Sequence, residues 1–474
     1  MPLLLRPAQA PTTVEGVPLR PAPGDLETQT ANLLRPAIEE TLNARVPGTS
    51  PRFRNSPQQF VLPCLFDDQE LLCLTARLNI LLTFHLWNLC HPDGNVAFGC
   101  LSQGIACVCA FPVSMDAFYC RVARRLEGLS PLMKGTYCGH LSRLDPLFGF
   151  LVYDILPRID VYVPHPEFRV FELVASNSVY AYEEAHSRAC VVGKFFGPTF
   201  GWDHYRAVER AEREYRNLET LRGYGLVGCP HHVIRPLALN RDLGCLLVQE
   251  HYRGEPLSQA IQGAIHQGSH AHLFWRLKAL GYFLATQHNR TANGQGVDFE
   301  EDCRYLDHLL GQLQAQRRID GQDADEFRWL RDRWREQPAM WQDQQVWLHG
   351  DATPANFLFG GGLDVAAIDL ERMKRGDRVF DVGRIAGELC QAFLNATGDS
   401  ARAEPFIGHF LWEYACHFPD RQRAFRSITQ RVPYYMGLTL LRIARNDWVS
   451  VSYCRTLIER AKPLLRSYWK KHAY

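Results

Sequence analysis

The sequence VWLHGDATPANFLF (Val346–Phe359), followed by VAAIDLE (Val365–Glu371), places a few polar side chains between runs of apolar residues. Asp351 comes first, Asn356 lies five residues later, and Asp369 lies thirteen residues beyond that. The flanking apolar runs predict short buried strands. Mg²⁺ prefers hard oxygen ligands, usually one or two carboxylates together with substrate phosphates. The spacing therefore indicates phosphoryl transfer, with Asn356 and Asp369 as metal ligands and Asp351 as the group that orients an acceptor hydroxyl and receives its proton.

These motifs resemble those of the aminoglycoside phosphotransferase and choline kinase superfamily. The catalytic loop of that family reads His-Gly-Asp, four residues, Asn, and its metal motif reads Ile-Asp with an acidic residue two positions later; this chain has both. The run Asp377–Gly383 also looks like the family motif whose Asp, here Asp381, braces the catalytic loop. The resemblance covers about residues 168 to 460. It implies an α+β, bilobal protein-kinase-like fold, with a small antiparallel β lobe, a mostly helical large lobe, and use of ATP and Mg²⁺.

Upstream of the catalytic loop, alternating apolar residues predict three strands of the small lobe, at residues 169–174, 179–183 and 189–196. Lys194 lies near the end of the third strand, where a kinase needs a cation to reach the nucleotide phosphates. We therefore expect Lys194 to bind phosphate.

A helix is predicted from Tyr205 to Arg222, because apolar residues recur there at three-to-four spacing. Glu212 and Glu214 are both candidates to pair with Lys194. The family pattern has Leu four and seven positions after the glutamate, and this pattern matches Glu214, which we therefore select.

The nucleotide is expected to contact two further segments. Ser176, Asn177 and Ser178 form a small polar turn whose backbone N–H groups and hydroxyls would approach the phosphates, although the turn lacks the repeated glycines of protein kinases. Backbone groups near Glu250 and Tyr252 resemble the hinge that hydrogen-bonds adenine.

Four regions are expected along the 474 residues: a flexible leader at 1–55, an N-terminal module of unknown fold at 56–165, the kinase-like small lobe at 166–252 and the helical lobe at 253–474. The apolar window Leu71 to Leu89 contains Arg77, Asn79 and other polar residues, so we expect no transmembrane span. No secretory signal opens the chain, and the fifteen cysteines are expected to be reduced thiols of a cytoplasmic protein.

The net charge of +1 offers no global field for gathering nucleic acid or an anionic membrane. From Asp420 to Tyr474 there are twelve Lys or Arg residues and three acids, the opposite of what a polycationic antibiotic requires. Arg442 and Arg445, three apart on a predicted helix, either face the cleft, where they would receive an anionic or sugar-like acceptor, or lie on the helix surface. Five aromatic residues near the C-terminus either pack in the core or form a cage for a choline-like ammonium group. They are Tyr434, Tyr435, Trp448, Tyr453 and Trp469.

The sequence thus predicts a kinase that transfers the γ-phosphate of ATP to a hydroxyl of a small molecule, such as a sugar, an amino alcohol or a related metabolite. Two alternatives stay open. One is a kinase of a protein or another macromolecule, with the N-terminal module as a docking surface for a protein partner. The other is a nucleotide-binding pseudokinase that acts as a scaffold.

Overall fold

The computed structural model describes residues 135–173, 178–197 and 203–467, together with short strands nearer the N-terminus. The chain divides into two compact units, one spanning Gln9–Leu129 and one containing Ser130–Tyr474. The first unit contains the paired strands β1 (Thr13–Val14) and β2 (Val17–Pro18), and a sheet of β3 (Phe60–Pro63), β4 (Ala97–Ser102) and β5 (Ile105–Ala110). The expected leader and most of the expected N-terminal module otherwise lie outside the described residues.

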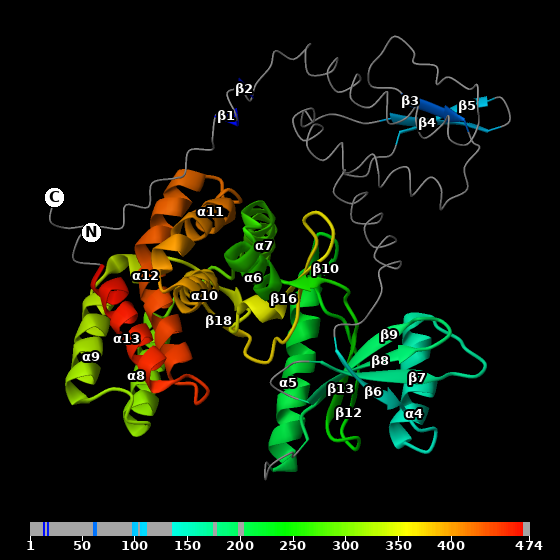
Figure 1. The fold of residues 1–474 in the computed structure, drawn as a ribbon, viewed down its shortest axis with the longest axis horizontal. Coiled ribbons are helices and arrows are strands. Elements are labelled where there is room, and N and C mark those ends of the chain that lie inside the picture. The colour runs from blue at the N-terminus through cyan, green and yellow to red at the C-terminus, as the bar shows by residue number, and fades with distance from the viewer. Residues whose placement is uncertain are drawn as a thin grey trace. The chain divides into compact units, whose positions relative to one another are not determined.

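The second unit opens with a six-stranded sheet in the order β12-β13-β9-β8-β7-β6, in which every neighbouring pair is antiparallel (Figure 1). Its strands are β6 (Thr136–His140), β7 (Phe168–Leu173), β8 (Ser178–Glu184), β9 (Cys190–Phe195), β12 (Pro236–Asn240) and β13 (Leu246–Glu250). The three strands predicted from alternation are confirmed as β7, β8 and β9. The sheet starts earlier than residue 166, the expected lobe boundary, because β6 pairs with β7.

The two faces of this sheet are covered by different elements. On one face, Leu246 and Val248 pack with a helical segment made of α4 (Pro146–Phe150), η2 (Leu151–Ile155) and η3 (Leu156–Ile159). On the other face, Leu247 packs with α5 (His204–Gly223). Successive side chains of a strand point to opposite faces of the sheet, so the apolar run of β13 packs against both the α4–η3 segment and α5. The predicted helix at 205–222 is thereby confirmed.

A second sheet, in the order β10-β11-β17-β16-β14, and the pair β15–β18 carry the polar motifs. Their strands are β10 (Val227–Gly228), β11 (His231–Val233), β14 (Glu255–Pro256), β15 (Gln345–Leu348), β16 (Phe357–Phe359), β17 (Val365–Ala367) and β18 (Lys374–Asp377). The hairpin β16–β17 separates Asn356 from Asp369 in sequence and joins them in space, since Phe357 pairs with Ala367.

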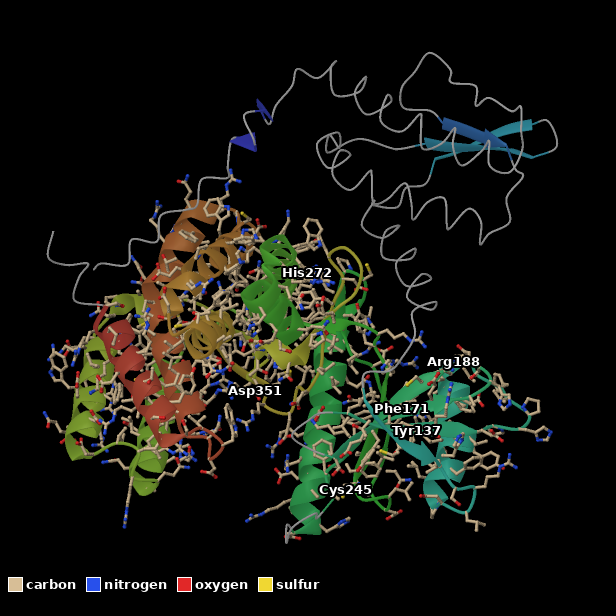
Figure 2. The ribbon with its side chains drawn as sticks, in the orientation of Figure 1. Tyr137, Phe171, Arg188, Cys245, His272 and Asp351 are labelled. Carbon is tan, nitrogen blue, oxygen red and sulfur yellow. The ribbon has the colours of Figure 1, made fainter. Side chains whose placement is uncertain are left out.

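The rest of the unit is helical (Figure 1). Its elements are α6 (Leu257–Gln267), α7 (His270–Thr291), α8 (Phe299–Ala315), α9 (Gly321–Arg335), η4 (Pro338–Met340), η5 (Pro354–Asn356), α10 (Val379–Thr397), η6 (Ser400–Ala403), α11 (Glu404–Ala415), α12 (Arg421–Ala444) and α13 (Val451–Arg466). The segment 302–334 is rich in charged residues, yet α8 and α9 each bury an apolar stripe; the two stripes include Leu306, Leu310 and Phe327. Figure 2 labels Asp351 in the region that carries β18 and α10, and Cys245 in the small lobe beside α5.

Seven described cysteines are not disulfide-bonded: Cys138, Cys190, Cys245, Cys303, Cys390, Cys416 and Cys454. Cys229 is disulfide-bonded, which contradicts the expectation of a reduced thiol at that position. Within the described residues, no helix is long and apolar enough to cross a membrane. The window Leu71 to Leu89 lies outside those residues.

Candidate active site

The catalytic loop is held by a buried carboxylate. Asp381, at the start of α10, accepts hydrogen bonds from the backbone N–H of His349 at 2.6 Å and of Gly350 at 3.1 Å. Burial by itself would raise the pKa of Asp381, but the hydrogen bond from His288 and the bonds of the loop outweigh it and lower the pKa. Asp381 therefore stays ionised and fixes the turn that precedes Asp351, which is the bracing role that the resemblance implies.

Gly350 is required by the shape of this turn. Its φ is +77°, a left-handed conformation that a side chain disfavours. A Cβ atom at this position would lie 1.9 Å from the carbonyl oxygen of Arg372, so no side chain fits without a backbone shift. The glycine lets the segments before Asp351 and after Asp369 approach each other closely.

The imidazole of His349 links the catalytic loop to the metal motif. Its Nε2 lies 3.0 Å from the carbonyl oxygen of Ile368, and its Nδ1 lies 3.3 Å from the backbone nitrogen of Asp351. The backbone N–H of Asp351 donates to Nδ1, so Nε2 carries the proton and donates to Ile368. This tautomer follows from the hydrogen-bond network and sets the register between Asp351 and Asp369.

Arginines surround the Asp351 carboxylate. Arg384 on α10 places Nη1 2.8 Å from Oδ1, Arg442 on α12 places Nη1 3.6 Å from the same oxygen, and Arg372 places Nε 3.8 Å from Oδ2. Burial would raise the pKa of Asp351, but the charges of Arg442, Arg384 and Arg372 outweigh it and lower the pKa. The carboxylate is therefore ionised and suited to accept a hydrogen bond from a hydroxyl. Of the two alternatives for Arg442, facing the cleft or lying on the helix surface, the structure shows the first.

Asn356 lies beside this carboxylate at the end of a 3₁₀ turn. Its Nδ2 donates to the carbonyl oxygen of Asp351 at 2.9 Å, which fixes the orientation of the amide. This orientation leaves the amide oxygen, Oδ1, as a ligand of the type that a hard cation prefers. Its backbone carbonyl receives the N–H of Ile368, so the loop and the metal motif are joined here as well.

Lys194 connects the small lobe to the metal motif. Its Nζ lies 2.6 Å from Oε2 of Glu214 and 2.6 Å from Oδ1 of Asp369. Burial would lower the pKa of Lys194, but these two carboxylates outweigh it and raise the pKa. Burial raises the pKa of Glu214, which is fully buried and also accepts from Gln249 at 3.1 Å. The structure thus brings Lys194 together with the glutamate that the sequence pattern selected.

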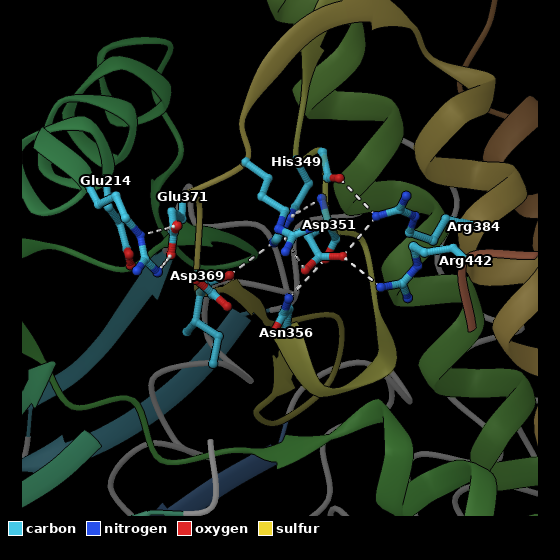
Figure 3. A network of polar contacts seen from close by, with 12 residues as sticks. Glu214, His349, Asp351, Asn356, Asp369, Glu371, Arg384 and Arg442 are labelled. Carbon is cyan, nitrogen blue, oxygen red and sulfur yellow. Dashed lines mark hydrogen bonds and ion pairs between the residues drawn. The ribbon is translucent and has the colours of Figure 1, made fainter. Parts of the chain in front are cut away.

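A further carboxylate lies next to this triad. Oxygens of Glu214, Asp369 and Glu371 lie within 4.8 Å of one another, a spacing at which carboxylates share a cation. Arg210 on α5 holds Glu371 through two bonds of 2.8 and 3.0 Å. Figure 3 shows Asp351 between Asp369 on one side and the arginines of α10 and α12 on the other. The oxygen donors of Asn356, Asp369 and Glu371 fit the chemistry of Mg²⁺.

The expected nucleotide contacts are only partly described. Ser176 and Asn177 lie outside the described residues, and Ser178 begins β8, where it pairs with Phe195. The backbone N–H of Glu250 donates to Arg235, and its carboxylate accepts from Arg235 and from His232, each at 2.6 Å. The N–H and side chain of Glu250 are therefore engaged within the protein, which leaves a hinge role to its carbonyl and to the residues that follow. Tyr252 lies beside His232, with ring centroids 5.7 Å apart.

No aromatic cage forms among the residues considered for an ammonium ligand that the structure describes. Tyr434 and Tyr435 are fully buried, and both hydroxyls bond to Asp302, at 3.4 and 2.9 Å. Tyr453 is half-buried and bonds to Gln391, whereas Trp448 is exposed. Trp469 lies outside the described residues. The tyrosines of α12 therefore belong to the core.

Two positions in this site were not singled out from the sequence. Arg384 follows Asp381 by three residues on α10, so one helical turn carries the loop brace and the closest partner of Asp351. Arg210 precedes Glu214 by four residues on α5; Arg210 holds Glu371, and Glu214 holds Lys194, which in turn contacts Asp369. Helical spacing from a recognised motif residue was the available signal in both cases.

Comparison with solved structures finds matches at low identity. An ethanolamine kinase from Plasmodium vivax is 14% identical over 73% of this chain and 95% of its own, with a TM-score of 0.45. A macrolide 2'-phosphotransferase from Brachybacterium faecium is 17% identical over 63% and 91%, with a TM-score of 0.36. A choline kinase from Streptococcus pneumoniae is 15% identical over 68% and 100%, with a TM-score of 0.39.

A search of curated proteins finds no match. The family model described as the phosphotransferase enzyme family matches residues 167–416, which is more than half of the chain and includes both lobes of the site. The chain therefore belongs to the phosphotransferase enzyme family.

Proposed function

We propose that this protein transfers the γ-phosphate of Mg²⁺-bound ATP to a hydroxyl group of a small molecule. The observation that carries the proposal is the set of contacts at Asp369, whose carboxylate meets Lys194 from the small lobe while its loop is tied to Asp351 through His349. One residue thus links the cation that would hold phosphate to the carboxylate that would meet the acceptor.

In the proposed reaction, the acceptor oxygen forms a bond to the γ-phosphorus as the bond to the β–γ bridging oxygen breaks. ADP leaves with that electron pair, and the proton of the acceptor hydroxyl passes to Asp351. Because nearby arginines lower the pKa of Asp351, this residue acts mainly by orienting the hydroxyl. Positioning and charge neutralisation supply most of the rate in such transfers.

The other residues hold the donor. Lys194 binds phosphate oxygens, and Glu214 keeps the lysine directed at them through the 2.6 Å contact. Asn356 and Asp369 would hold Mg²⁺, with Glu371 next to them; a bound Mg²⁺ neutralises the charge that develops on the phosphates. The residues after Glu250 and the turn that includes Ser178 are proposed to contact the nucleotide.

The test combines a binding experiment with a transfer experiment. We expect wild-type protein to bind ATP by calorimetry in the presence of Mg²⁺ and to release ADP with at least one member of a panel of sugars, polyols, amino alcohols and nucleosides. Mg²⁺-dependent binding without turnover of any acceptor would favour a scaffold. Phosphate transfer to protein but to no small molecule would favour the macromolecular alternative.

A further inference from the structure

The acceptor side of Asp351 carries an excess of arginine. Arg384, Arg442 and Arg372 all lie within 3.8 Å of the Asp351 carboxylate. Arg442 also pairs with a second carboxylate, since Oε1 of Glu388 lies 2.6 Å from its Nη2. Arg372 keeps 55% of its side chain exposed, so it is accessible to a ligand.

A pocket of about 480 Å³ lies beside the end of α12, and Arg445, one of its lining residues, is close enough to Arg442, Arg372 and Asp351 to interact with their charges. Arg445 lines it and lies one helical turn after Arg442, so both guanidinium groups extend from the same face of the helix. Its Nη1 donates to Oε1 of Gln312 at 2.7 Å. The other lining residues are Ala315, Gln316, Asn446, Asp447 and Trp448. This volume suits a small metabolite.

The charges around this pocket favour an anion. Asp447 is the one acid among the described residues that line it, and the amide of Gln316 lies 3.3 Å from that carboxylate. Arg445 and Asp447 balance each other in the pocket lining, so the positive excess comes from the neighbouring cluster. There Arg384, Arg442 and Arg372 face two carboxylates, those of Asp351 and Glu388. Burial lowers the pKa of Arg445, and the charges of Arg442 and Arg372 lower it further, as expected for guanidinium groups held close together.

We propose that the acceptor is an anionic hydroxyl compound, a sugar-like molecule with a carboxylate or a phosphate group. Arg445 and Arg372 bind the anionic group, because guanidinium groups match the oxygens of carboxylate and phosphate. The exposed ring of Trp448 covers the apolar face of the carbon chain, and the hydroxyl reaches Asp351. This proposal rests on the proposed phosphotransferase function and narrows its acceptor. It excludes the amino alcohols.

The same arrangement disfavours cations. An ammonium group in a partly desolvated pocket gains only where a carboxylate receives it. Asp351 and Glu388 already face arginines, and Asp447 lies at an exposed position. A cationic acceptor would therefore meet repulsion from Arg372 and Arg445 before it reached Asp351.

The experiment uses two matched series: gluconate, sorbitol and glucamine, and glucose 6-phosphate, glucose and glucosamine. Each compound is titrated calorimetrically into full-length protein that holds Mg²⁺ and a non-hydrolysable ATP analogue, and ADP release is measured in parallel with ATP. We expect the anion of at least one series to bind about tenfold or more tightly than its neutral relative. The cation should bind most weakly. The first series tests a carboxylate and the second a phosphate.

Arg445→Gln should remove most of the preference for the anion, a loss of about tenfold, while the affinity for the ATP analogue stays the same. Arg372→Gln, at an exposed side chain, provides a second variant if Arg445→Gln does not fold. Arg426→Gln, at an exposed arginine on the same helix, is the matched control and should leave the preference unchanged. Raising the salt concentration should weaken the binding of the anion and leave the binding of its neutral relative unchanged.

The proposal is wrong if neither anion binds, if a neutral or cationic member binds as tightly as its anion, or if both variants keep the preference. These outcomes are separable from failure of the proposed function. Loss of Mg²⁺-dependent binding of the ATP analogue, measured without acceptor, would contradict the function itself and the acceptor proposal with it.

Discussion

Replacing Lys194 with Met should destabilise the protein through the carboxyl group that it leaves behind. Lys194 and Glu214 expose 7% and 0% of their side chains, so solvent screens neither group. Met keeps the apolar stem of the lysine and removes the ammonium group; Asp369 loses the same contact, but its side chain is 30% exposed and can be solvated. Glu214 would retain the hydrogen bond from Gln249 and lose its cation. Removing one partner of a buried ion pair typically costs about 3–5 kcal/mol.

The magnitude can be bounded from the titration of Glu214. Once Lys194 is gone, the folded protein avoids a buried unpaired charge by protonating this carboxyl group, whose ordinary pKa is 4.5. Holding it neutral at pH 7 then costs about 3.4 kcal/mol, because each pH unit above the ordinary pKa costs about 1.36 kcal/mol. The pKa of Glu214 in the folded variant is raised above its unfolded value, so stability is greatest at low pH and is lost as pH rises.

The assay is chemical denaturation of both proteins at pH 7 and at pH 5. The destabilisation relative to wild type should shrink from about 3 kcal/mol at pH 7 to about 1 kcal/mol at pH 5. Adding Glu214→Gln to Lys194→Met should restore part of the loss, because the buried carboxyl group is then absent. Glu209→Gln, at an exposed pair with Arg213 on the same helix, should change stability by at most about 0.5 kcal/mol. A loss that does not depend on pH, or that Glu214→Gln deepens, would refute the reasoning.

Three further results are expected. Asp351→Asn should lower the rate of phosphoryl transfer by about 10²- to 10⁴-fold with little change in calorimetric ATP affinity, since the lost group contacts the acceptor; near-normal turnover would contradict its role. Gly350→Ala should lower the free energy of unfolding by about 1–3 kcal/mol from the strain at φ +77° alone, and by more from the contact with the Arg372 carbonyl; an unchanged denaturation midpoint would contradict the tight turn. Expression in a susceptible bacterium should confer no resistance to kanamycin, because arginines surround Asp351; a raised inhibitory concentration that Asp351→Asn abolishes would overturn the charge argument.

Local pattern was sufficient for elements whose faces differ in polarity. The alternation in β7, β8 and β9 and the apolar stripe of α5 follow directly from one face packing on a core. The contact between Lys194 and Glu214 could be expected from the family pattern on that helix. By contrast, β6 was missed because its residues are mostly exposed and show no alternation of burial. The buried faces of α8 and α9 were missed because abundant charged residues obscured the apolar stripe between them.

The surroundings of Asp351 could not be predicted in the same way, because they combine α10, α12 and the segment after Asp369. Arg384 and Arg442 are 58 residues apart in the sequence and meet at one carboxylate through the packing of two helices. Nothing in the local spacing of either arginine indicates this contact. The excess of basic residues near the C-terminus also indicated a positively charged site. Not all of these residues contribute to it, because Arg431 forms buried ion pairs with Asp343 and Asp377.

The most direct test of the central claim follows the phosphate itself. Protein is incubated with Mg²⁺ and ATP labelled at the γ-phosphate, together with the acceptor panel, and the label is traced by separating small molecules from protein. The account predicts that label appears in a small-molecule product and that both Asp351→Asn and Asp369→Ala abolish its appearance. It further predicts that Asp369→Ala also weakens Mg²⁺-dependent nucleotide binding, whereas Asp351→Asn does not. Transfer at a near-normal rate in either variant, or ATP affinity that is unchanged in Asp369→Ala, would contradict the account.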